Sequence, residues 1–212
     1  MGGRVFDSYD LATGQFGSSV IDQAYGMLGY AAQFGAGIEP ARARLTQLQL
    51  PNGGWEFATG FGADTNTTAL AIQALAAAGE PATTPTMQRA LQYLRTQQNP
   101  DAGFPYQVPC GYPGCDASDA NSTAYVVQAL TAAGENADSW VWSRHFTATH
   151  SITLTVQTPL DTLLVLQSDE GGFAGFSGPN DLYATLQAVP GVAERSQPMA
   201  RRATQIFPGI RR

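Results

Sequence analysis

One pattern recurs along this chain: a short polar segment leads into an almost wholly apolar run. The pattern spans residues 64–79, returns at 119–134, and has a third copy at 180–189 and a fainter one at 21–30. Self-similarity with a period of roughly 45–60 residues is the sequence signature of a repeat architecture. Repeats bury their apolar faces against one another, so we expect residues 1–212 to form a single repeat domain.

Each unit is expected to contain two different helices. The apolar run, as in residues 69–78, is apolar on every side, and such a helix must be buried on every side. After a short turn, residues 84–97 place apolar side chains at i, i+3, i+4 and i+7, which predicts an amphipathic surface helix. Proline stands where each of these second helices should begin, a position at which its missing N–H costs nothing. The prolines are Pro40, Pro85, Pro159 and Pro198.

A turn of common form, Gln-x3-Gly/Ala-Gly-aromatic, follows three of the second helices. Glycine permits the tight reversal at a helix C-terminus, and the aromatic ring can pack back between neighbouring units. We therefore expect these glutamines and aromatic residues to be structural, with the rings buried as wedges. They are Gln49 and Trp55, Gln98 and Phe104, and Gln167 and Phe173.

These patterns predict an all-α fold of about four helical hairpins with inner and outer helix layers. The third unit carries an insertion at about residues 135–157, where Ile152, Leu154 and Val156 alternate with threonines and predict a short extended segment. The hairpins are expected at about residues 19–49, 64–98, 119–167 and 178–207.

The charge and hydropathy of the chain bear on its partners. The net charge is −6, and all 11 basic residues are arginines. Nucleic-acid binding needs a basic face that neutralises phosphates, so we expect no nucleic-acid partner. The sequence has no run of about 18 apolar residues, so we expect no membrane-spanning helix.

Both cysteines lie in one short loop. Cys110 and Cys115 are separated by a segment rich in Gly and Pro, which favours a turn and hence a short disulfide. A disulfide would suit an extracytoplasmic or secreted protein, and two free thiols are the alternative. Two cysteines without a nearby histidine give little support to a zinc site, so we expect neither a metal nor a cofactor.

At the polar segments and the glycine-aromatic turns, the chain resembles the prenyltransferase and squalene-cyclase repeat superfamily, the α/α-toroid proteins. The segment Gln49–Trp55 resembles the QW motif of squalene–hopene and oxidosqualene cyclases. Over about residues 10–207, the chain is most similar to bacterial, often secreted, prenyltransferase/squalene-oxidase repeat proteins, and more distantly to cobalamin carriers of the transcobalamin type. The resemblance implies a ring of apolar helices inside a ring of amphipathic ones, with a ligand entering at one end.

A closed toroid of this family has more hairpins than the four expected here, so the resemblance implies a partial toroid. The inner helices at its ends would then expose apolar residues around Tyr25, Met27 and Tyr30, or around Leu182, Tyr183 and Leu186. Exposed patches of that size are disfavoured in monomers. We expect them to be covered by self-association, by the inserted segment or by a further part of the protein.

Cyclases of this superfamily that protonate an alkene carry the motif Asp-x-Asp-Asp-Thr-Ala, whose middle Asp is the general acid. On this resemblance Asp64 keeps the first Asp, whereas the acid's position is Asn66 and the next is Thr67. Neither Asn nor Thr can supply the proton, which requires a carboxylic acid of tuned pKa. The second copy departs from the motif in the same way, at Asp119, Asn121 and Ser122.

The catalytic residues are therefore unknown from the sequence. Asp22 and Asp181 occupy the fourth motif position in their copies, but without the flanking Asp. With Asp64 and Asp119 they are the weak candidates for a catalytic acid.

Two interpretations of the polar segments remain open. They fall at equivalent ends of the inner helices, where their side chains would converge on a ligand. Asp and Asn at such positions also cap helices and satisfy loop backbone groups. The candidate ligand-facing residues are Asp64, Asn66, Thr67, Asp119, Asn121, Ser122, Asn180 and Asp181.

The degraded acid motif favours a non-catalytic repeat module over an enzyme. Such a module would bind a bulky apolar ligand, of isoprenoid or cobalamin size, or a protein partner on its concave inner surface. The alternative is a terpene- or squalene-cyclase-like or prenyltransferase-like enzyme. An enclosed apolar pocket that contains a buried carboxyl group would favour the enzyme, and an open, shallow arc would favour binding.

Overall fold

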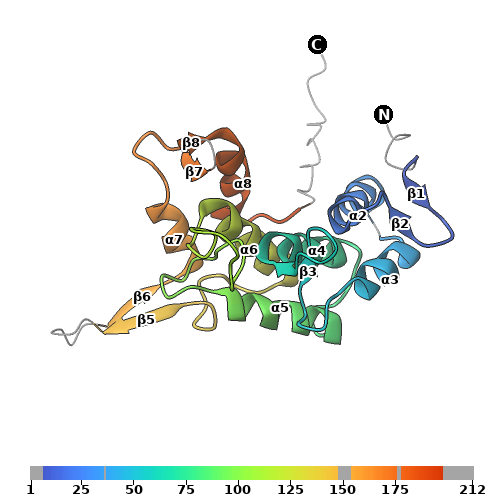
Figure 1. Cartoon of the computed structure of the whole chain (residues 1–212), viewed down its shortest axis with the longest axis horizontal. Helices are drawn as coiled ribbons and strands as arrows, with labels where there is room; N and C mark the ends of the chain where they lie inside the picture. The colour runs from blue at the N-terminus through green and yellow to red at the C-terminus, as the bar shows by residue number, and fades with distance from the viewer. Residues whose placement is uncertain (1–6, 36, 148–153, 176–177, 198–212) are drawn as a thin grey trace, which may run out of the picture.

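The computed structural model describes residues 7–35, 37–147, 154–175 and 178–197 (Figure 1). The described part is mostly helical, with seven helices and eight short strands. Its inner helices are α2 (Val20–Phe34), α4 (Thr65–Ala77), α6 (Ala120–Ala133) and α8 (Leu182–Val192).

The inner helices lie side by side in chain order. Helix α2 packs against α4, α4 against α6, and α6 against α8. Helices α4 and α6 have neighbours on both sides, and Thr65 and Thr67–Leu75 of α4 are buried without a break. Their wholly apolar runs are thus explained, because a helix enclosed on all sides has no face that water can reach.

Three further helices form a second layer. They are α3 (Glu39–Gln47), α5 (Pro85–Gln97) and α7 (Pro159–Val165), and each packs on the inner helix that precedes it. Each begins with Pro at its first or second position, as the sequence pattern predicts. Helix α5 buries one stripe against α4 and keeps its other face in solvent.

An all-α fold is not what the structure shows, because four two-stranded antiparallel sheets accompany the helices. Two of the ladders are short because they only join a glycine-aromatic turn to the residue that caps the next inner helix: Trp55 pairs with Asp64, and Phe173 pairs with Asp181. The pairs are β1 (Tyr9–Asp10) with β2 (Gln15–Phe16), β3 (Trp55–Glu56) with β4 (Ala63–Asp64), β5 (Arg144–Thr147) with β6 (Leu154–Gln157), and β7 (Phe173–Gly175) with β8 (Gly178–Asp181).

The inserted segment of the third unit forms the β5–β6 pair. Strand β6 contains Leu154 and Val156, where the alternating pattern predicts extended backbone. Ile152 lies outside the described residues. The pair leaves the helical layers next to α7 (Figure 1).

The three glycine-aromatic turns share one hydrogen-bonding scheme. In each, the glutamine Nε2 donates to the backbone oxygen four residues later at 2.9 Å, as from Gln49 to Gly53. The N–H of the aromatic residue donates to a threonine Oγ1 on the next inner helix at 2.9–3.0 Å, as from Trp55 to Thr68. The rings of Trp55, Phe104 and Phe173 are at most 2% exposed. Each turn is thereby fixed to the start of the next inner helix.

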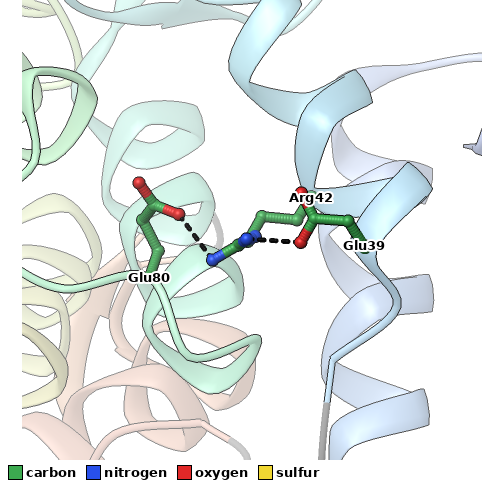
Figure 2. Close-up of polar contacts among 3 residues, drawn as sticks. All are labelled: Glu39, Arg42 and Glu80. Atoms are coloured by element: carbon green, nitrogen blue, oxygen red, sulfur yellow. Dashed lines mark hydrogen bonds and ion pairs between the residues drawn. The ribbon is translucent and has the colours of Figure 1, made fainter.

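An ion-pair network links the first two units. The Arg42 guanidinium on α3 contacts Glu39 one turn earlier and lies 3.0 Å from a carboxylate oxygen of Glu80, which follows α4 (Figure 2). Glu80 is the less exposed of the two acids, with 14% of its side chain accessible. The network therefore holds α3 against the residues that follow α4.

The second helix expected in the fourth hairpin, which begins at Pro198, lies outside the described residues. The described chain ends at Gln197, whose backbone N–H donates to Gln73 Oε1 of α4 at 3.0 Å. The division into four hairpins therefore stays a prediction. Within the described ranges, none of the helices has the length and apolarity needed to cross a bilayer.

Candidate functional site

The polar segments cap the inner helices. One carboxylate oxygen of Asp64 accepts the N–H of Thr67 at 2.7 Å, and Asp119 and Asp181 make the equivalent bond at the same distance to the third residue after them. In α2 the cap is Ser19, which forms a capping box with Asp22. Each of these four acidic residues thus satisfies N–H groups that a helix start leaves unpaired.

A cavity of about 230 Å³ opens where the N-terminal ends of the inner helices meet. Its lining has a simple register, because it uses positions two and six after the capping residues of α2, α4 and α6 and position two after that of α8. These positions lie one helical turn apart on a single face. The lining from position two is Ile21, Asn66, Asn121 and Tyr183; that from position six is Tyr25, Leu70 and Tyr125; Phe57, Asp64, Thr67 and Tyr106 complete it.

Asp64 is the buried acid of this cavity, with 1% of its surface exposed. Burial raises the pKa of its carboxyl above the usual value of 3.8, and the N–H groups of Thr67 and Phe57 oppose that rise by hydrogen bonding to the ionised form. Both carboxylate oxygens are therefore engaged by backbone donors. Asp64 is built as a hydrogen-bond acceptor that caps α4.

Tyrosines form much of the cavity wall. The hydroxyls of Tyr25 on α2 and Tyr125 on α6 lie 3.1 Å apart and share a hydrogen bond. Burial and this bond raise the pKa of Tyr125. Burial, together with the charge of Asp64, raises the pKa of Tyr106 to about 12. Tyr125 and Tyr106 therefore stay neutral at physiological pH and can donate or accept a hydrogen bond.

Asn66 and Asn121 occupy equivalent places at the starts of α4 and α6. Both line the cavity, and the side-chain oxygen of each is buried without a hydrogen-bond partner among the described residues. A buried polar atom without a partner carries a free-energy penalty that a bound ligand can relieve.

Of the eight residues expected to face a ligand, four meet at this cavity: Asp64, Asn66, Thr67 and Asn121. Asp119 and Ser122 bond to each other beside it. Asn180 is exposed, is not part of the cavity lining and accepts a hydrogen bond from the Ser168 hydroxyl. The tyrosines of the cavity are not among the predicted residues. The spacing of two or six residues from each capping residue would have predicted Tyr25, Tyr125 and Tyr183.

The loop between α5 and α6, which contains both cysteines, carries one further wall residue, Tyr106. Cys110 and Cys115 are joined in a disulfide with their Cα atoms 5.7 Å apart. The loop is tied to α4, because the N–H of Thr65 donates to the backbone oxygen of Tyr106 at 2.8 Å. Tyr106 therefore reaches the cavity from outside the helical layers. In the described ranges, His, Cys, Asp and Glu side chains form no cluster of three or more that could hold a metal ion.

The chain belongs to the family of the squalene-hopene cyclase C-terminal domain, whose model matches residues 10–144, more than half of the sequence. This places it in the prenyltransferase and squalene-cyclase superfamily. A comparison with curated proteins finds no significant match.

Solved structures of terpene cyclases share the fold. A variant of the type II terpene cyclase MstE from Scytonema, in complex with its substrate geranylgeranyl dihydroxybenzoate, superposes with a TM-score of 0.59 at 16% identity over 89% of this chain and 55% of that one. A second variant, in complex with the product merosterolic acid A, gives 0.57 at 18% identity over 89% and 56%. The ent-copalyl diphosphate synthase of Streptomyces platensis gives 0.51 at 20% identity over 82% and 33%. The chain spans about half the length of the first of these enzymes.

Proposed function

We propose that this chain is a partial α/α toroid of a terpene-cyclase-like protein, and that its cavity binds an isoprenoid chain. The observation that carries the proposal is the cavity itself, in which every inner helix contributes positions two or six after its cap and a buried carboxyl group lies in a largely aromatic and aliphatic wall. A concave, mostly apolar pocket with a few polar groups is typical of a small-molecule site.

The toroid interpretation draws on the order of the helices. The inner helices α2, α4, α6 and α8 stand in a row, with α3, α5 and α7 on the outer side. In an α/α toroid this row would curve around the ligand, and the converging helix starts would form its mouth. The superfamily membership of the chain supports this geometry.

The described residues form the walls of the site, but they are less suited to supply the acid that a cyclase needs. Asp64 accepts backbone N–H bonds at both oxygens, and Asn66 and Asn121 stand where the cyclase motif places carboxyl groups. A non-catalytic isoprenoid carrier is therefore the second candidate function. What favours it is the pair of amides at the position where an alkene-protonating cyclase needs an acid.

The test combines binding with product analysis. Radiolabelled squalene and geranylgeraniol are incubated with the purified chain, bound label is measured by gel filtration, and extracts are examined by gas chromatography and mass spectrometry. We expect retention of label, which Leu70→Trp should abolish by filling the cavity. Val141→Trp, at a half-exposed site outside the cavity, is the matched control.

The possible outcomes distinguish the enzyme from the carrier, and both from a chain that has no isoprenoid site. Cyclised product supports the enzyme, and bound but unchanged ligand supports the carrier. Absence of binding by the unmodified chain, or equal binding by the Leu70→Trp variant, would refute the proposed site.

We also propose an extracytoplasmic location, supported by the Cys110–Cys115 disulfide, because such bonds persist in oxidising compartments. The cellular test is the redox state of the two cysteines after acid quenching of cells that produce the protein. Fully reduced thiols would contradict this location.

A further inference from the structure

We infer that the cavity selects an isoprenoid whose polar end is an uncharged hydrogen-bond donor, an alcohol, and that it rejects an isoprenoid diphosphate. The inference rests on the proposed isoprenoid-binding function and adds the chemical class of the ligand's head group. It follows from the charges around the cavity, from the state of the helix N-termini and from two unpaired side-chain oxygens.

The first step concerns charge. Among the described residues that line the cavity, Asp64 alone is ionisable to a full charge near neutral pH, and that charge is negative. A diphosphate is recognised by Arg, Lys or a bound metal ion, and its burial beside a carboxylate without such a partner is strongly unfavourable.

The described arginines are committed elsewhere. Arg42 pairs with Glu39 and Glu80, and Arg44 donates to Gln15 on β2 at 2.8 Å. Two lie on α5, where Arg89 bonds to Gln49 and Arg95 lies over the Trp142 ring. Arg144 on β5 donates to the Gln98 backbone oxygen, and Arg195 follows the C-terminal end of α8.

The second step concerns the helix N-termini. A helix start with free N–H groups is a ready anion site. Here the starts of α4, α6 and α8 already hold the carboxylates of Asp64, Asp119 and Asp181 at 2.7 Å. The positive ends of these helices are thus neutralised by the chain's own side chains, and a phosphate group would meet acceptors instead of donors.

The third step concerns what the cavity offers in place of cations. Asn66 Oδ1 and Asn121 Oδ1 are buried acceptors without partners, on two neighbouring helices at equivalent positions. The hydroxyls of Tyr25 and Tyr125 already bond to each other. A ligand hydroxyl can donate to one of the amide oxygens and remove its penalty, whereas an ether, an ester or a phosphate oxygen cannot.

The decisive experiment compares three ligands that share one hydrocarbon chain: geranylgeraniol, geranylgeranyl methyl ether and geranylgeranyl diphosphate. Dissociation constants are measured by equilibrium dialysis of the radiolabelled compounds against the full chain. We expect the alcohol to bind about three- to tenfold more tightly than the methyl ether, the ratio that one net hydrogen bond supplies. The diphosphate should bind more weakly than the methyl ether.

Substitutions test whether the preference for the alcohol over the ether comes from the side-chain amides of Asn66 and Asn121. Asn66→Leu and Asn121→Leu should each reduce the ratio between alcohol and ether, and together they should bring it to one. Asn180→Leu is the matched control, because Asn180 stands two residues before the start of α8 and is exposed outside the cavity. Thermal unfolding midpoints of all variants show whether each is folded, and the ligand series on the unmodified chain decides the inference without them.

Failure of the inference differs from failure of the proposed function. If the ether matches the alcohol, or the diphosphate binds more tightly than either, the head-group inference is wrong while isoprenoid binding stands. If none of the three ligands binds and squalene does not bind either, the proposed function is wrong and the inference falls with it.

Discussion

Trp55 shows at the scale of one residue how the repeat units are joined. Its ring is fully buried, its Nε1 donates to the Leu45 backbone oxygen at 2.8 Å, and its N–H donates to Thr68 on the next inner helix. This one residue therefore connects α3, its own turn and α4. Truncation of its side chain removes apolar burial and leaves one buried acceptor, the Leu45 backbone oxygen, unpaired.

Replacement of Trp55 by Ala should lower the free energy of unfolding by about 3–5 kcal/mol, the usual range for a large buried aromatic residue. Urea unfolding followed by circular dichroism measures the change. Trp140→Ala is the matched control, because this ring is 71% exposed, and exposed substitutions usually change stability by less than about 0.5 kcal/mol. An unchanged midpoint for Trp55→Ala would contradict its role as a wedge between units.

The buried acid Asp64 should leave a signature in the pH dependence of stability. Its folded-state pKa is raised above 3.8 by burial, so the folded chain binds this proton more tightly than the unfolded chain does. Its contribution to stability is therefore full below pH 3.8 and is lost as pH rises through the folded pKa. Asn does not titrate, so the Asp64→Asn variant lacks this pH dependence. The unfolding free energy of the natural chain minus that of Asp64→Asn should therefore decrease as pH rises from 3.8 through the folded pKa.

Asp22 provides a control of opposite sign. Hydrogen bonds from the Ser18 N–H and the Ser19 hydroxyl lower the pKa of its carboxyl. Its contribution is present above the usual value of 3.8 and is lost as pH falls through the folded pKa, so the same difference measured with Asp22→Asn should rise with pH. Urea unfolding at a series of pH values gives both differences. Equal slopes for the two variants would mean that burial of Asp64 has no thermodynamic effect.

At the scale of elements, the helices could be predicted because their patterns are long and periodic. The unbroken apolar run of α4 indicates burial on every side, and Pro85 marks the start of α5. The strands β3 and β4 could not be predicted, since ladders of two residues are shorter than the alternation that identifies a strand.

The same contrast applies to the cavity. Asp64 and Asn66 could be predicted as site residues because they stand in a repeated segment at a helix start. Tyr106 could not be predicted, because it comes from the loop between α5 and α6, whose place beside α4 is fixed by a hydrogen bond from the Thr65 N–H to the Tyr106 backbone oxygen. Contacts between segments distant in sequence depend on the packed structure, and no local pattern records them.

The disulfide loop is the element whose state is easiest to measure. We expect mass spectrometry of the unreduced protein, denatured in the presence of an alkylating reagent, to find no modified cysteine, because Cys110 and Cys115 are bonded to each other. After reduction, both residues should be alkylated. Two alkylated thiols without reduction would show that the loop is held by other contacts.

At the scale of the whole molecule, the two ends of the helical row differ. At one end, the β1–β2 pair covers α2 (Figure 1), and Phe16 is buried against Gly26 while Met27 is 2% exposed. Of the residues expected to be exposed at this end, Met27 is therefore buried, whereas Tyr25 is 46% exposed. At the other end, α8 packs on α6 and presents an uncharged outer face to solvent. The exposed residues of that face are Leu182, Tyr183, Leu186 and Val189.

This difference predicts how copies of the chain associate. Because α2 is covered, the α8 end of one copy cannot pack on the α2 end of the next to form a head-to-tail chain. Two α8 faces can instead meet about a twofold axis and form a closed dimer. The contact would remove a large apolar patch from water, and it would close the cavity on the side where Tyr183 lines it. Light scattering should give twice the mass of one chain for the natural protein and the mass of one chain for Leu186→Arg. Leu11→Arg, at an 85% exposed site beside the covered end, should remain dimeric. A natural chain that stays monomeric at high concentration would show that α8 is not a self-association face.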